Sequence, residues 1–164
     1  NVVAPRWLAE RGFAPLESGW EISVLIGGYG VGAAFWGWIG DREHQRTRAL
    51  LVAACGAMLC WLLIATLPVR SALGVAALFA LAGACCGAFG LIYPLIAERH
   101  PPSHAGGVIA CVNCGIPLGA AVLQNLAGRL RDGAAPWLLF AVGALTVAGA
   151  AALLAERRCM KPTR

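Results

Sequence analysis

The residues best placed for chemistry lie in the segment 37–48, which reads Gly-Trp-Ile-Gly-Asp-Arg-Glu-His-Gln-Arg-Thr-Arg. A long apolar block precedes this segment, so Asp41 would lie at the carboxyl end of a helix, where the helix dipole is negative. An acid in that position is stabilised by a neighbouring group of positive charge. We therefore expect Asp41 to accept hydrogen bonds from the amides of Gly106 and Gly107 at the start of another helix. The chemistry indicated here is ion pairing rather than catalysis.

Three arginines of the same segment, Arg42, Arg46 and Arg48, have a second acid within reach. This acid is Glu98, which ends a later apolar block, and we expect it to pair with one or more of them. Exposed ion pairs contribute little to stability, so a simply solvated charged loop is the alternative. Both interpretations stay open at this point.

A second polar group interrupts the otherwise apolar block 106–128. At about 100° per residue, the side chains of Asn113 and Gln124 lie about 20° apart around a helix. Pro117 shares this face and removes a hydrogen bond to the carbonyl of Asn113, which leaves a kink and a free acceptor. These residues either line a cavity or hydrogen-bond to a neighbouring helix. With Tyr29 of an earlier block, they are our candidates for lining a substrate cavity.

Other motifs do not support an enzyme. The pair Cys111-x-x-Cys114 has no second pair and no nearby His, so we interpret its thiols as packing residues. The glycine-rich run 28–33 follows no strand and lies within an apolar block, which excludes a dinucleotide site. No Ser/His/Asp set, carboxylate pair or phosphate loop is present. We expect no catalytic activity, no cofactor and no metal.

The elements that carry these residues are long apolar blocks. Of the 164 residues, 59% are hydrophobic and 13% are charged, whereas soluble chains have about 45–50% apolar and about 25% charged residues. Crossing a bilayer takes about 20 apolar residues in a helix. Five blocks are that long: Trp20 to Ile39, Ala49 to Leu67, Ala72 to Ala97, Gly106 to Gly128, and Trp137 to Ala155. The expected fold is all-α and membrane-spanning, with five transmembrane helices in a lipid bilayer.

Small residues recur at four-residue spacing in three of these blocks. Such spacing makes a smooth strip on one helix face and lets a neighbouring backbone approach closely. The strips serve either tight packing or the sliding of one helix over another. They are Gly28 and Gly32, Gly83 and Gly87, and Gly115 and Gly119.

The positive charges set the orientation. Short cytoplasmic loops carry an excess of Lys and Arg, and eight of the 13 such residues fall on the side that includes the basic tail. We therefore place the tail 156–164 in the cytoplasm, the bundle 20–155 in the membrane, and residues 1–19 outside. Residues 1–19 would hold an exterior loop and the end of a missing preceding helix. The net charge of +5 forms no basic face, so no nucleic-acid partner is expected.

At this point the sequence resembles the major facilitator superfamily of secondary transporters. The family's cytoplasmic loop runs G-x-x-x-D-R-x-G-R-R, and Gly37, Asp41, Arg42 and Arg46 fall in register with it. His44 and Gln45 depart from the pattern, and this degeneracy resembles the copy found in the second half of such transporters. The segments 6–12 and 98–128 are similar to loops and helices of the C-terminal half of sugar-phosphate-permease-like members.

The resemblance implies that the five helices are the eighth to twelfth of a twelve-helix transporter, part of a six-helix bundle. It implies secondary active transport of a small solute by alternating access, with the N-terminal half of the same transporter as a partner. A coupling proton or ion would be a further partner. The segment with Gly37, Asp41, Arg42, Arg46 and Glu98 would gate the cytoplasmic side. We expect the location to be the bacterial inner membrane. The alternative is a free-standing five-helix scaffold or assembly subunit without transport activity.

Overall fold

The computed structural model describes residues 8–9, 12–43, 46–67, 71–129, 141–142 and 145. The elements of this part of the chain are helical. They are, in order, α2 (Pro15–Glu43), α3 (Arg46–Thr66), α4 (Ala72–Cys86), the 3₁₀ helix η1 (Gly87–Leu91), α5 (Ile92–Arg99) and α6 (Pro102–Arg129).

Four helical stretches are long and apolar enough to cross a membrane within the described residues. They are Gly19–Arg42, Arg46–Thr66, Ala72–Arg99 and Pro102–Leu123, where the third combines α4, η1 and α5. They correspond to the first four expected spans. The fifth, 137–155, lies outside the described residues except for positions 141, 142 and 145, so the count of five stays a prediction.

Several helix boundaries differ from the expectation, most of all in α2 and α6. Helix α2 begins at Pro15 and continues to Glu43, so Asp41 and Arg42 lie in its last turn rather than in a loop. Helix α6 begins at Pro102 rather than at Gly106. Proline suits the first turn of a helix because its fixed φ is helical and its missing N–H would have had no partner there. Apolar composition alone indicated neither extension, since both add polar or charged turns to the spans.

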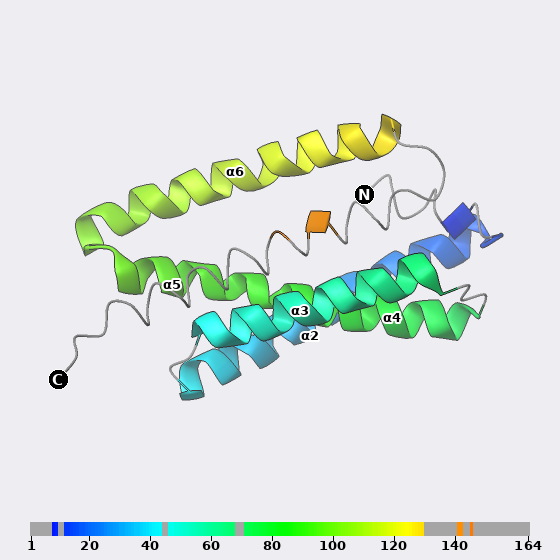
Figure 1. The fold of residues 1–164 in the computed structure, drawn as a ribbon, viewed down its shortest axis with the longest axis horizontal. Helices are drawn as coiled ribbons and strands as arrows, with labels where there is room; N and C mark the ends of the chain where they lie inside the picture. Colours follow the sequence, from blue (N-terminus) through cyan, green and yellow to red (C-terminus); the bar gives the residue numbers. More distant parts are fainter. Residues whose placement is uncertain are drawn as a thin grey trace.

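Helices α2, α3 and α4 form a packed group, and α6 runs beside α5 (Figure 1). Helix α2 contacts α4 and η1, while α3 packs on α4. One apolar cluster joins Leu8, Ile64, Val75 and Phe79, and a second joins Ala49, Ala53, Ala88 and Leu91. Of the α6 residues whose burial is described, none is buried within this chain.

The contact between α2 and α4 is made by two of the predicted glycine strips. A Cβ atom added to Gly28 or Gly32 would fall within 3.0 Å of the carbonyl oxygen of Ala80 or Ala84, respectively. In the opposite direction, Gly83 and Gly87 meet the backbone of α2. Tight packing is thus confirmed for these two strips. A Cβ on Gly115 or Gly119 would meet nothing within 4 Å, so the third strip makes no such contact among the described residues.

The third span is one helix in the sequence-based expectation, but the structure interrupts it with η1 at Gly87–Leu91. Pro94 explains this difference, because it cannot donate to the carbonyl of Gly90 and its ring crowds that carbonyl. Next to the break, the indole Nε1 of Trp36 donates to the carbonyl oxygen of Ala84 at 2.9 Å. The α2–α4 contact is therefore held by a hydrogen bond as well as by close backbone packing.

Candidate functional site

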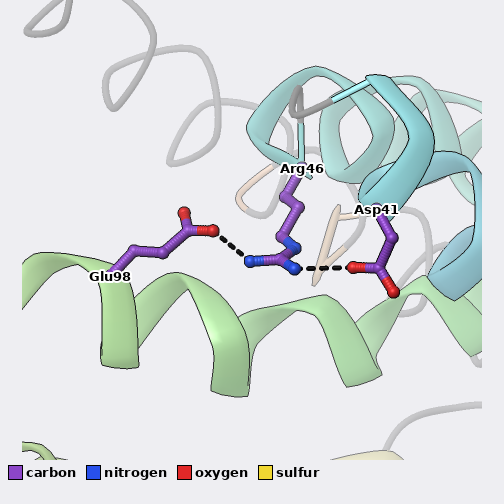
Figure 2. A network of polar contacts seen from close by, with 3 residues as sticks. All are labelled: Asp41, Arg46 and Glu98. Carbon is purple, nitrogen blue, oxygen red and sulfur yellow. Dashed lines mark hydrogen bonds and ion pairs between the residues drawn. The ribbon is translucent and has the colours of Figure 1, made fainter.

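An ionic network joins the ends of three helices (Figure 2). Arg46 is the first residue of α3, Asp41 lies in the last turn of α2, and Glu98 lies near the end of α5. The Nη2 of Arg46 donates to Oδ1 of Asp41 at 2.6 Å, and its Nη1 donates to Oε1 of Glu98. One guanidinium thus holds two carboxylates that come from different helices.

Helix dipoles explain why these three residues come together. Both acids lie at the negative, carboxyl ends of their helices, while Arg46 lies at the positive, amino end of α3. Each charge is unfavourable in its own helix, and each is compensated by a neighbour of opposite sign. The side chain of Arg46 is 22% exposed, against 68% for Asp41 and 46% for Glu98. The cation is thus the covered centre of a network whose acids remain open to solvent.

The predicted pairing of Arg46 with Glu98 is confirmed, but the predicted partner of Asp41 is wrong. Asp41 pairs with Arg46 rather than with the amides of Gly106 and Gly107. The reason is the start of α6 at Pro102, which places both amides inside the helix, where they serve the helix itself.

Two other residues of the predicted gating segment have different surroundings. The guanidinium of Arg42 lies 5.1 Å from the centroid of the Trp38 ring, a cation–π contact. Gly37 is open, because an added Cβ would meet nothing within 4 Å. Gly40, which sequence reasoning missed, is the crowded glycine: its Cβ would lie 2.8 Å from Leu91 Cδ2 and 3.2 Å from Arg46 Cγ. Its position one residue before Asp41 was the available signal.

Asn113, on the polar face of α6, contacts α5. The hydroxyl of Tyr93 donates to Oδ1 of Asn113 at 2.8 Å, so Asn113 makes an interhelical hydrogen bond, one of the two roles left open above. Sequence reasoning missed Tyr93, since a tyrosine beside a proline in an apolar span gave no spacing pattern. Pro117 is exposed, and the side chain of Gln124 lies outside the described residues.

Tyr29 has a different place from Asn113 and Pro117. It lines a cavity of about 530 Å³ between the helices, together with Trp61 of α3, Cys86 of α4, Phe89 of η1 and Ile116 of α6. Asn113 and Pro117 do not line this cavity. The structure therefore separates the candidates into a cavity residue, Tyr29, and an α5–α6 contact residue, Asn113.

One buried acid also escaped the sequence analysis. Glu21 of α2 is only 1% exposed, near the end of the helix opposite to Asp41. As the second residue of an apolar block, Glu21 gave no sequence signal of burial. As for metals, the described residues contain no group of three His, Cys, Asp or Glu side chains that could hold an ion.

Comparison with known proteins decides the family. The family model for the Major Facilitator Superfamily matches residues 1–162 of the chain. The chain belongs to the major facilitator superfamily. No curated protein and no solved structure matches it. Members of the major facilitator superfamily are transporters that handle small solutes within the membrane. This chain is therefore an integral membrane protein of the transporter class. Its length of 164 residues fits a fragment of such a transporter.

The Tyr93–Asn113 hydrogen bond leads to a first prediction for this transporter. Tyr93→Phe and Asn113→Leu should each lower the free energy of unfolding by about 0.6 kcal/mol, the average for an interhelical hydrogen bond in a membrane. The double variant should lose no more than either single variant, because both remove the same bond. Unfolding in detergent titrations measures this. Asn125→Leu is the control, since Asn125 donates to Ala121 of its own helix. Additive losses would contradict a shared bond.

Proposed function

We propose that this chain forms helices eight to twelve of a twelve-helix secondary transporter, which moves a small solute by alternating access. Helices α2 and α3 would be the eighth and ninth, the span 72–99 the tenth, and α6 the eleventh. The degenerate loop motif at Gly37, Asp41, Arg42 and Arg46 supports this assignment to the C-terminal half. The N-terminal half would supply the opposing bundle, and a coupling proton or ion would be a further partner of transport.

The observation that carries the proposal is the bridge from Arg46 to Asp41 and Glu98. A latch on the cytoplasmic side must close firmly in one state and open at low cost in the next. Partly exposed ion pairs meet both demands, because each contributes only about 0–1 kcal/mol yet depends strictly on geometry. The network therefore biases a two-state equilibrium without contacting the solute.

The same proposal fixes the orientation and location. The ionic network and the basic tail 156–164 would lie on the cytoplasmic side of a bacterial inner membrane, in keeping with the excess of Arg and Lys there. The opposite ends of α2 and α3 would then face the exterior.

An uptake experiment tests the function. Cells expressing the full transporter are given a defined mixture of charged and uncharged metabolites, and mass spectrometry follows which solute disappears from the medium relative to cells without it. We expect at least one solute to be taken up. No uptake of any solute would favour the scaffold alternative.

The latch has its own test in the same cells. Asp41→Asn should lower the uptake rate of the solute found, because the neutral amide holds Arg46 more weakly. The amount of protein in the membrane, measured on blots of membrane fractions, should not change. Uptake equal to that of the parent would remove Asp41 from the mechanism.

A further inference from the structure

The cavity lined by Tyr29 is bordered by residues from near the middle of the four described spans, and by Val142 beyond them. Tyr29 is at the centre of α2 (Pro15–Glu43), Ala57 is near the centre of α3 (Arg46–Thr66), and Cys86 is near the centre of the span Ala72–Arg99. Ile116 lies at the centre of α6 (Pro102–Arg129). The cavity is thus near the middle of the membrane, the depth at which secondary transporters bind their solutes. Its volume of about 530 Å³ falls in the range of small-molecule sites, about 300–1,000 Å³.

The lining of the cavity carries no charge. Asp, Glu, Lys, Arg and His are absent from the described residues that border it, and its polar groups are the hydroxyl of Tyr29, the indole of Trp61 and the thiols of Cys85 and Cys86. A charged solute would lose its hydration there with no counter-charge to replace it. An uncharged, largely apolar solute would exchange water for apolar contacts and would lose little.

Two aromatic rings of the lining have neighbours that restrict their orientation. Trp61 packs edge-on against Phe79 with centroids 6.1 Å apart, and Phe89 packs edge-on against Tyr93 at 6.0 Å. Such pairs have preferred geometries, so the rings are positioned before a ligand arrives. Preset rings favour a solute with a flat apolar body, because little side-chain ordering is left for binding.

The cysteines show which wall of the cavity is adaptable. Cys85 is held toward α3, since its Sγ lies over Gly56, where a Cβ would be 2.8 Å away. Cys86 is exposed and also borders the cavity. A larger side chain at position 86 would therefore enter the cavity without disturbing the α3–α4 contact.

From these observations we infer that the midplane cavity is a solute site for an uncharged, largely apolar molecule with an aromatic or similarly flat body. This inference rests on the proposed transport function and specifies its substrate class. It assigns Tyr29, Trp61, Phe89 and Cys86 to the wall that contacts the solute. A phosphorylated or carboxylated solute would not bind in this cavity.

A binding experiment on the full transporter in lipid nanodiscs tests the inference without any transport. The probe is N-phenyl-1-naphthylamine, an uncharged fluorophore, and its anionic counterpart is 8-anilinonaphthalene-1-sulfonate. We expect a saturable fluorescence increase with the uncharged probe, above the linear background of empty nanodiscs. Cys86→Trp should weaken this binding at least tenfold. Cys55→Trp should not, because Cys55 is an exposed cysteine of α3 that does not border the cavity.

Several results would overturn the inference. They are the absence of a saturable phase in the parent, equal binding by the two tryptophan variants, and binding of the anionic probe as tight as that of the uncharged one. A phospholipid that co-purifies with the parent and with Cys55→Trp, but not with Cys86→Trp, would show that the cavity seats a lipid chain instead. The proposed function is judged separately: uptake of a charged solute would retain transport and reject this substrate class.

Discussion

Gly32→Ala should destabilise the protein by about 3 kcal/mol, at the upper end of the usual cost of overpacking. The added methyl group would fall on the carbonyl oxygen of Ala84, and neither backbone can move aside without separating α2 from α4. That separation would also break the hydrogen bond from Trp36 to Ala84. Unfolding of the purified transporter, followed by melting curves and detergent titration, measures the loss.

Gly30→Ala is the matched control for this prediction. Gly30 lies in the same helix, but a Cβ there would meet nothing within 4 Å. Alanine favours a helix over glycine by about 0.5–1 kcal/mol, so this variant should be as stable as the parent or slightly more stable. Because the obstacle at Gly32 is a backbone atom, Ala84→Gly should not rescue Gly32→Ala. Equal melting of the two alanine variants, or rescue by Ala84→Gly, would show that the α2–α4 contact is looser than described.

The spans and the glycine strips could be predicted because both follow from local spacing. Twenty apolar residues in a row imply a membrane helix, and Gly28 with Gly32 implies one smooth face. Spacing within one helix cannot say which other helix covers that face. The pairing of Gly28 and Gly32 with Gly83 and Gly87 therefore required the structure.

The candidate site was predictable in part for a similar reason. Charges stand out in an apolar sequence, so Arg46 and Glu98 could be paired by complementarity. The predicted partner of Asp41 was wrong because that prediction assumed that α6 begins at Gly106. The helix begins at Pro102 instead. The cavity was missed except for Tyr29, since small side chains such as Ala57 and Ala88 on separate helices leave its space. The sequence of a single helix does not show where small side chains on several helices together leave space unfilled.

Arg46→Gln should lower the uptake rate at least fivefold, the lower end of typical couplings between two protein states. Glutamine removes the cation, so Asp41 and Glu98 are left as two uncompensated acids at negative helix ends. Under the proposed latch, their repulsion would open this side of the protein and shift the two-state equilibrium away from closure. The free energy of unfolding should fall by less than about 1 kcal/mol, because partly exposed ion pairs contribute little to folding.

Arg46→Lys separates charge from geometry at the same position. Two different nitrogens of Arg46 serve the two carboxylates, and a single ammonium group cannot reproduce that fork. Uptake by Arg46→Lys should therefore lie between that of the parent and that of Arg46→Gln. Arg99→Gln, which removes an exposed cation next to Glu98, serves as the control and should transport at the rate of the parent. If Arg46→Gln instead unfolds the protein, the network acts through stability alone. If Arg46→Lys transports at the rate of the parent, the network acts through charge alone. A latch requires that one guanidinium hold α2 and α5 at once, and only a loss of uptake in a folded protein is consistent with it.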